Sequence, residues 1–312
     1  MGELTPDPTL TLVLRLAFGQ PIRATPVPVV AGASDTGQVF ALHGAHSPAQ
    51  VILRRYPPAR QTQALRAFHV MRALRALHFP VPEVYYLGWH GHDGDTLLLA
   101  EWVAGKRVAG QPYAFFARVG EDFAYTLARL HALPWDALQD LPMTPLRYAF
   151  SELSRLVRRL ETWELQEILD WLEGHLDGIE ELPRVIVHGS YSLECAVAQP
   201  PQIVAIEGWE HTVIADPRFD VGFASAMLGA YGVPLSDQFL EAYQAAAGPL
   251  PDLPFWEVFS ALRLLARVAR SLSTLRAEQR ERFLAQAFPY WQGLLALVEA
   301  RTGLQLLWPR QR

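Results

Sequence analysis

The groups with the clearest capacity for chemistry lie between positions 185 and 210, in the segment VIVHGSYSLECAVAQPPQIVAIEGWE. Ser190 carries a hydroxyl that could act as a nucleophile, but the Gly-x-Ser-x-Gly turn that exposes such a serine is absent, which disfavours a hydrolase. Cys195, the single cysteine, fits a small loop or core residue better than a reactive thiol. One cysteine also excludes an intramolecular disulfide and a metal site built from several cysteines.

A second group of polar side chains occurs in HGHDGD, where His90, His92, Asp93 and Asp95 are all types that bind metals. They are crowded between two apolar runs, VYYLGW and TLLLAEWV, and a Gly/Asp turn of this kind closes a hairpin. A solvated hairpin turn is therefore the preferred interpretation, and a metal site is the alternative.

The N-terminal part of the chain has the pattern of a β-sheet with one helix. Apolar runs separated by small residues predict strands over residues 27–57. Apolar residues then recur at helical spacing over residues 61–78, and FPVP ends that helix.

After Gly105 the pattern becomes helical, with a helix ending near His131, a long helical region over 151–176 and more helices over 235–305. Only the 185–210 segment returns to strand. The sequence predicts an α+β protein with an antiparallel N-terminal lobe, residues 1–104, and a mainly helical C-terminal lobe, residues 105–312.

The composition disfavours nucleic acid as a partner and a membrane as the location. The net charge is −5 at pH 7 and the pI is about 6.1, so no basic surface for nucleic acid is expected. No run approaches the roughly 18 apolar residues of a membrane span, and the N-terminus does not resemble a signal peptide. A cytoplasmic protein with an unknown small-molecule or protein partner is expected.

The order of these segments resembles the aminoglycoside phosphotransferase and choline kinase family, whose members share the protein-kinase fold. The resemblance covers about residues 29–265 and is carried by AGASDTGQVF, VILRRYPP, FPVPEVYYLG, LLLAEWVAG, LARLHALPW and DPRFDVGFA. It implies a two-lobed kinase-like fold and says less about activity.

The resemblance also shows which catalytic groups are replaced. The family's loop reads His-Gly-Asp with an asparagine five positions later, and a second aspartate precedes a tryptophan. Here Ser190 stands at the position of the base, Cys195 at that of the asparagine and Gly208 at that of the second aspartate. No confident catalytic residue remains.

The resemblance assigns other positions as well. Arg54 stands where the family has a phosphate-binding lysine, and Ala67 where the lysine's glutamate partner would be, so Arg54 is expected to lack a carboxylate partner. Cofactor contacts are expected at Ser34, Asp35, Arg54, Glu101 and Val103. Mainly structural roles are expected at His188, Trp209, Asp216 and Asp220.

Magnesium prefers oxygen ligands, which the side chains at Gly208 and Cys195 do not supply, so no metal site is expected at these two positions. Glu207 and Glu194 are the candidates to replace the missing ligands, and Glu210 is a further carboxylate near the loop. Strand alternation predicts that Glu207 points away from the phosphate side unless a bulge reverses it.

The sequence thus favours a pseudokinase that binds a small molecule, a nucleotide or a protein without phosphoryl transfer. The alternatives are a divergent ATP-dependent phosphotransferase of a small hydroxylated or amino compound, and a scaffold with a closed cleft. No cofactor is expected for the pseudokinase beyond ATP or another nucleotide, and magnesium is expected only for the enzyme.

Overall fold

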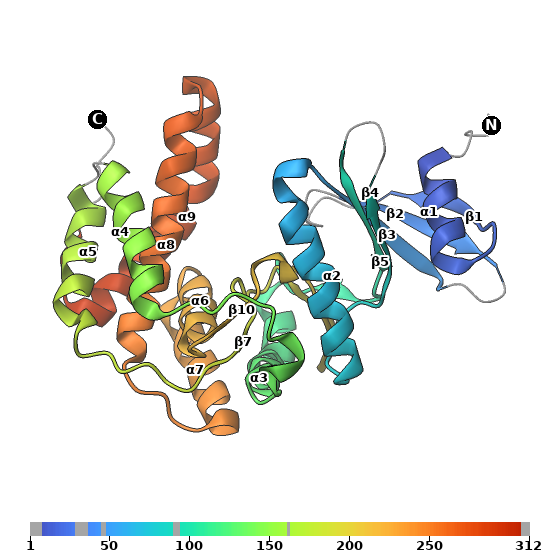
Figure 1. Cartoon of the computed structure of the whole chain (residues 1–312). Coiled ribbons are helices and arrows are strands. Elements are labelled where there is room, and N and C mark those ends of the chain that lie inside the picture. The colour runs from blue at the N-terminus through green and yellow to red at the C-terminus, as the bar shows by residue number, and fades with distance from the viewer. Residues whose placement is uncertain (1–7, 29–36, 45–47, 90–93, 161–162, 307–312) are drawn as a thin grey trace. The chain divides into compact units, whose positions relative to one another are not determined.

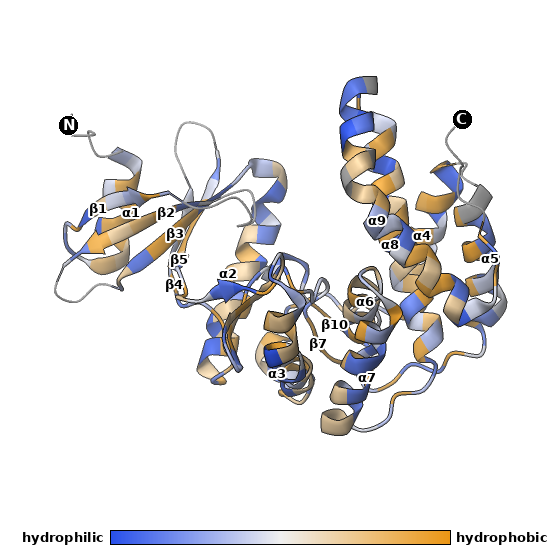
Figure 2. Cartoon of the chain, turned by 180° about the vertical axis from the view of Figure 1, so that it is seen from behind, coloured by the Kyte–Doolittle hydropathy of each residue, from blue (hydrophilic) through white to orange (hydrophobic). Residues whose placement is uncertain are grey.

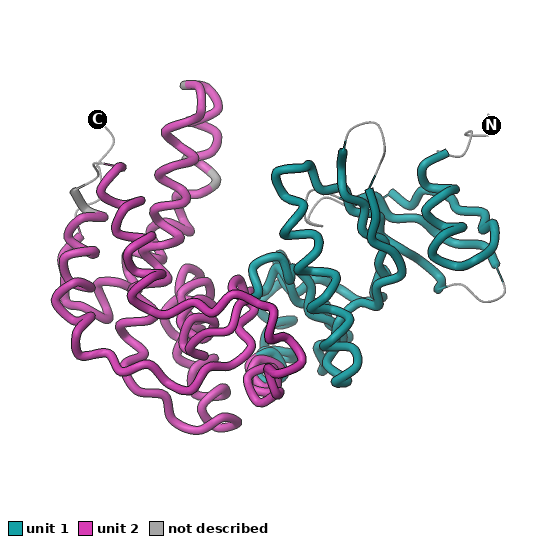
Figure 3. Tube along the Cα trace, in the orientation of Figure 1, with its two compact units in different colours: residues 1–123, 193–212 teal, residues 124–192, 213–312 magenta. Residues whose placement is uncertain are grey.

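The structure is a computed structural model of the 312-residue chain, and it describes residues 8–28, 37–44, 48–89, 94–160 and 163–306. Figure 1 shows its helices and strands. The chain divides into two compact units, one of residues 1–123 and 193–212 and the other of residues 124–192 and 213–312 (Figure 3). The predicted lobe boundary at residue 104 stays a prediction, and these units differ from it by assigning 105–123 and 193–212 to the first unit.

The first unit is built on a five-stranded antiparallel sheet, which confirms the predicted N-terminal architecture. The spatial order is β1-β2-β3-β5-β4. The strands are β1 (Arg23–Val27), β2 (Gly37–His43), β3 (Gln50–Tyr56), β4 (Val84–Trp89) and β5 (Thr96–Glu101). Strands β4 and β5 form the predicted hairpin, whose turn at 90–93 lies outside the described residues.

Two helices of this unit contact the sheet's strands. Helix α1 (Pro8–Phe18) was not predicted, because its apolar run is short and contains Arg15. It buries Leu10, Val13 and Leu14 in a cluster with Val51 and Leu53 of β3. Helix α2 (Gln61–Ala76) agrees with the predicted helix over 61–78 and contacts β4 and β5. In Figure 2 hydrophobic and hydrophilic residues both occur along these strands, as expected for a sheet whose faces differ.

A smaller three-stranded sheet completes the first unit. Its order is β6-β8-β9, formed by β6 (Lys106–Arg107), β8 (Ala196–Gln199) and β9 (Gln202–Ile206). A short 3-10 helix, η3 (Trp209–His211), follows β9 and packs against α2. Another one-turn 3-10 helix, η1 (Pro58–Arg60), connects β3 to α2. This small sheet therefore brings residues near 107 beside residues near 197, which are far apart in the sequence.

The second unit is mainly helical. It contains the two-stranded sheet of β7 (Val185–Val187) and β10 (Val213–Ala215) and the 3-10 helix η2 (Trp135–Leu138). Its helices are the end of α3 (Tyr113–His131), then α4 (Leu146–Leu160), α5 (Trp163–Leu176), α6 (Arg218–Gly229), α7 (Val233–Ala247), α8 (Leu253–Thr274) and α9 (Ala277–Thr302). The single long helical region expected over 151–176 is the pair α4 and α5.

Helix α8 is the centre of the second unit, and α4, α5, α6 and α9 all pack against it. Every residue of α6 is buried. A Cβ at Gly222 would lie 2.5 Å from the carbonyl oxygen of Trp256, so only glycine allows α6 and α8 to approach this closely. No described helix is long and apolar enough to span a bilayer.

Candidate functional site

Arg54 lies on β3 on the opposite face from the α1 cluster. Because side chains alternate along a strand, Val51 and Leu53 enter that cluster while Arg54 and Tyr56 point to the other side. Arg54 is only 4 % exposed. A cation this well buried requires a counter-charge, since an unpaired buried charge is strongly unfavourable.

Glu207 supplies that counter-charge. Its Oε2 accepts a hydrogen bond from Arg54 Nη2 at 2.8 Å, and the pair is buried, with 5 % of each side chain exposed. Burial alone would lower the pKa of Arg54, but the charges of Glu207 and other nearby acidic groups outweigh it and raise the pKa overall. The expectation that Arg54 lacks a carboxylate partner is therefore wrong. Ala67 of α2, where a partner was sought, is buried and apolar.

The expected direction of the Glu207 side chain is also wrong, and β9 shows why. Val197 pairs with Ala205 and Ala198 pairs with Ile203, so Val204 is an extra residue in the strand. Such a β-bulge interrupts the regular alternation of sides. Glu207 follows the strand end, its N–H donates to Cys195 O at 2.8 Å, and its carboxylate points to Arg54.

Arg107 is a second cation on the same carboxylate. Its Nη2 donates to Glu207 Oε2 at 2.8 Å, and its guanidinium carbon lies 5.4 Å from the centre of the Trp102 ring. The sequence assigned Arg107 no role, and it is the pairing of β6 with β8 that brings it to Glu207. We call Arg54, Glu207 and Arg107 the Arg-Glu-Arg cluster. It carries a net charge of +1.

The Arg-Glu-Arg cluster is not fully satisfied. The Nε atoms of Arg54 and Arg107 are buried and have no hydrogen-bond partner among the described residues. Each is a donor, and a buried donor without an acceptor costs about 1–3 kcal/mol. The two Nε–H groups of the cluster could therefore donate hydrogen bonds to an anion.

Gly208 follows Glu207 and has φ 86° and ψ 41°, in the left-handed region that glycine adopts without strain. The next residue, Trp209, is fully buried, and its Nε1 donates to Ile206 O at 2.8 Å. The turn thus fixes the end of β9 through backbone conformation, where the family's aspartate would offer a metal ligand.

The other carboxylates near this turn have different environments. Glu210 accepts a hydrogen bond from Tyr56 at 2.7 Å. Glu194 is exposed, and its main-chain oxygen rather than its carboxylate faces Arg107, at 3.5 Å. Throughout the described part of the chain no three His, Cys, Asp or Glu side chains come together as a metal site.

Two further cofactor candidates lie at the end of β5 and just beyond it. Glu101 accepts a hydrogen bond from the Glu83 N–H at 3.1 Å, and its own N–H donates to Glu83 O at 2.7 Å. Val103 is half-buried. Ser34 and Asp35 lie outside the described residues, as do three members of the HGHDGD group, and the fourth, Asp95, pairs with Arg55.

In the second unit, Asp220 holds the loop that contains Ser190. Its carboxylate accepts the N–H of His188 at 2.5 Å and the N–H of Gly189 at 2.8 Å, and His131 Nε2 lies 3.5 Å away. The Ser190 N–H donates to His188 Nδ1 at 3.3 Å. Asp220 and His188 are fully buried, which favours the structural roles predicted for them.

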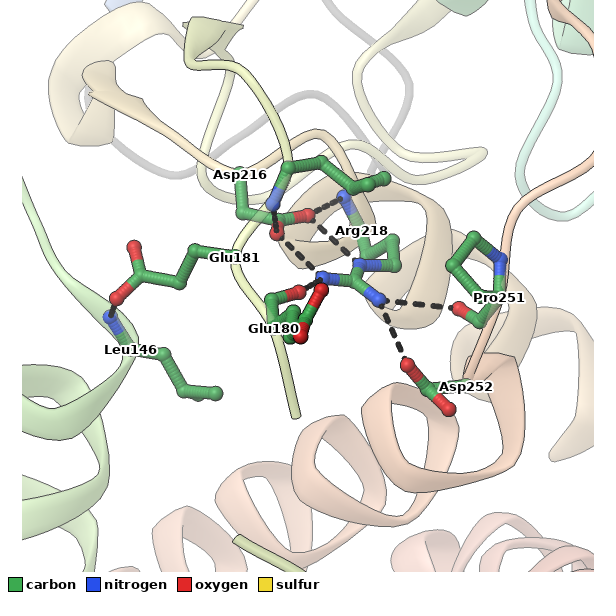
Figure 4. A network of polar contacts seen from close by, with 8 residues as sticks. Leu146, Glu180, Glu181, Asp216, Arg218, Pro251 and Asp252 are labelled. Atoms are coloured by element: carbon green, nitrogen blue, oxygen red, sulfur yellow. Dashed lines mark hydrogen bonds and ion pairs between the residues drawn. The ribbon is translucent and has the colours of Figure 1, made fainter. Parts of the chain in front are cut away.

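Asp216 is the centre of a second buried network, drawn in Figure 4. It forms an ion pair at 2.7 Å with Arg218, and both residues are fully buried. Arg218 also donates to the main-chain oxygens of Glu180 and Pro251. The network joins α6 to the segment before β7 and to the start of α8, so its function is to position backbone.

Comparison with known proteins identifies the relatives of this chain. The sequence profile of the phosphotransferase enzyme family matches residues 27–265. Acyl-CoA dehydrogenase family member 11 of Rattus norvegicus is 26% identical over 258 residues, which cover 71% of this chain and 33% of that protein. The chain thus spans about a third of that relative's length.

Solved structures share the fold at low sequence identity. An aminoglycoside-3'-phosphotransferase of type VIII has a TM-score of 0.58 and 20% identity, covering 82% of this chain and 100% of its own. A spectinomycin phosphotransferase, in complex with ADP and spectinomycin, has a TM-score of 0.66 and 12% identity, covering 96% of this chain and 100% of its own. These similarities establish the kinase-like fold predicted from the sequence.

Proposed function

Because this chain belongs to the phosphotransferase enzyme family, we propose that it is a phosphotransferase-like binding protein that does not transfer a phosphoryl group. The observation that carries the proposal is the double ion pair of Glu207. The carboxylate best placed in the sequence to replace a metal ligand bonds two guanidinium groups through one oxygen.

Magnesium would have to compete with both arginines for Glu207. The ion needs nearly octahedral oxygen ligands, usually one or two carboxylates with phosphates and water. Gly208 has no side chain, and the Cys195 thiol is a soft ligand. Loss of metal charge stabilisation removes several kcal/mol from the transition state, and loss of a general base costs about 10²–10⁴-fold in rate.

A nucleotide is the first ligand to test, because the related spectinomycin phosphotransferase was solved with ADP. Arg54 is the phosphate-binding candidate, and its positive charge is partly neutralised by Glu207. We therefore expect weak nucleotide binding that magnesium leaves unchanged or weakens, since the ion would neutralise the phosphates that the arginines attract.

Calorimetric titration of ATP, with magnesium and with a chelator, tests the proposal. Arg54→Gln should reduce any ATP affinity, whereas Arg55→Gln is the matched control, because Arg55 is exposed on the other face of the same strand. A tenfold gain in affinity from magnesium, about 1.4 kcal/mol, would contradict the proposal and favour the divergent phosphotransferase.

The enzyme alternative has its own test. Restoring Ser190→Asp, Cys195→Asn and Gly208→Asp together is the smallest change expected to produce ATP hydrolysis, and each change alone should do little because such groups act as a unit. Wild-type turnover of about 1–100 s⁻¹, as in ordinary kinases, would overturn the binding proposal. Absence of any ligand binding would favour the closed scaffold.

A further inference from the structure

Helix α8 carries a line of polar side chains along one face. Trp256, Ser260, Arg263 and Arg267 are spaced by four, three and four residues. At 3.6 residues per turn this spacing places all of them on one face. We call this set the α8 donor stripe, because each side chain has N–H or O–H groups to donate.

The first half of the α8 donor stripe is buried and unsatisfied. Trp256 and Ser260 have no exposed surface, and neither Trp256 Nε1 nor Ser260 Oγ has a hydrogen-bond partner among the described residues. Buried polar groups in proteins nearly always have partners, so two unpaired groups one turn apart require an explanation. A hydrogen-bond acceptor from a bound ligand is one such explanation.

Arg263 continues the stripe as a half-buried cation. Its guanidinium carbon lies 5.8 Å from the centre of the Phe223 ring and 5.9 Å from that of Phe259. In the described part of the chain it forms no hydrogen bond and no ion pair. Burial, and then the charge of Arg267, lowers the pKa of Arg263 to about 10, so it remains positively charged at neutral pH.

Two buried carboxylates of the second unit, Asp220 and Glu257, already have partners. Asp220 accepts two main-chain N–H groups and faces His131. Glu257 of α8 accepts hydrogen bonds from Ser225, Ser236 and Arg301. Neither is within ion-pair distance of Arg263. The charge of Asp220 nevertheless acts to raise the pKa of Arg263, against the effect of burial.

Positive charge continues beyond Arg263 without acidic residues. Arg267 lies one turn further and Arg270 follows it, and α8 has no Asp or Glu after Glu257. Burial lowers the pKa of Arg267, and the neighbouring charge of Arg270 lowers it further. Repulsion between like charges on one helix is relieved when an anion lies between them.

We propose that the α8 donor stripe binds the carboxylate or phosphate group of a small anionic ligand, with Arg263 and Arg267 as its charged contacts. A polycation such as an amino sugar is repelled by this surface. The inference rests on the proposed binding function, since it names the chemistry of a ligand. It involves no nucleotide and no magnesium, so either proposal can fail alone.

Calorimetric titration of the full chain at low ionic strength, with inorganic phosphate and separately with succinate, tests the inference. We expect saturable binding of at least one probe, and the probe that binds more tightly identifies the group that the site prefers. Arg263→Gln should weaken that binding at least fivefold, and Arg267→Gln by a smaller factor. Arg280→Gln, a matched change of an exposed arginine on α9, should leave it unchanged.

Two further measurements assign the site. Arg72→Gln, a change of an exposed arginine in the first unit, should leave phosphate and succinate binding unchanged. In the absence of anions, Arg263→Gln should unfold at the same temperature as wild type or higher, since a desolvated cation is removed. No saturable binding of either probe, or equal affinity in wild type and Arg263→Gln, would overturn the inference, as would a destabilised Arg263→Gln that binds anions normally.

Discussion

The region around Asp220 and the region around Glu207 both resemble segments of the phosphotransferase family. They differ in which of the family's side chains are present. Asp220 and its neighbours retain the groups that hold backbone: both carboxylate oxygens accept main-chain N–H groups. At the other region we propose that the groups of the family's chemistry are replaced: Gly208 stands where the resemblance predicts a metal ligand, and Glu207 is bonded to two arginines.

The difference has a physical cause. Removing Asp220 leaves buried N–H groups without acceptors, so the fold itself depends on this carboxylate. A general base or metal ligand contributes little to folding, and Ser190, Cys195 and Gly208 are small replacements that fit without such a penalty. If the proposed function holds, backbone support and catalytic chemistry are separable between these two regions.

The largest expected effect is that of Asp220→Ala. It removes the acceptor of the His188 and Gly189 N–H groups and the partner of His131 Nε2, so the free energy of unfolding should fall by about 3–5 kcal/mol. Urea titration followed by circular dichroism measures it. Asp177→Ala, with 88 % of the side chain exposed, is the control and should change stability by less than about 0.5 kcal/mol. If Asp220→Ala lowers the free energy of unfolding by less than 1 kcal/mol, the proposed difference between the two regions is wrong.

Glu207→Gln tests the other region and should have the next largest effect. It leaves Arg54 and Arg107 as buried cations without a counter-charge, which should lower the free energy of unfolding by about 3 kcal/mol. Glu194 is exposed, so the free energy of unfolding of Glu194→Gln should lie within about 0.5 kcal/mol of the wild-type value. If Glu207 is a metal ligand instead, magnesium will raise the melting temperature of the wild type and not that of the variant.

Gly208→Ala asks whether the turn after β9 needs glycine for its backbone. The left-handed conformation should cost alanine about 1–2 kcal/mol. Gly174→Ala is a control of opposite sign: it lies in α5 with no atom within 4 Å of an added Cβ, so alanine should stabilise by about 0.5–1 kcal/mol. Thermal unfolding of both variants measures these changes in stability. A Gly208→Ala variant as stable as wild type would show that the turn can adopt another backbone conformation without cost.

The smallest effect is expected for Arg147→Ala. Its ion pair with Asp177 leaves 69 % of one side chain and 88 % of the other exposed, so its loss should cost less than about 0.5 kcal/mol. The measurement is urea unfolding at low and at physiological salt. A salt-dependent loss above 1 kcal/mol would show that surface pairs contribute as much as the buried cluster.

The sequence alone determined the architecture and led to the hypothesis that the catalytic groups are replaced. The sheet, α2 and α8 follow from periodic apolar residues, because local pattern decides which face of an element is buried. The identity of Ser190, Cys195 and Gly208 can be read directly once the motif is aligned. Helix α1 was missed because its apolar run is short and contains Arg15, and the sheet that buries Leu10, Val13 and Leu14 cannot be read from the run itself.

Only the tertiary structure decided what Arg54 and Arg107 bind. Glu207 is 153 residues from Arg54 and 100 from Arg107, so no local pattern connects them. The direction of Glu207 depends on one extra residue, Val204, in β9, and a bulge leaves no reliable mark in a short apolar strand. Pairing of β6 with β8 then brings Arg107 to the same carboxylate, since a buried charge is stable only where the fold supplies its partner.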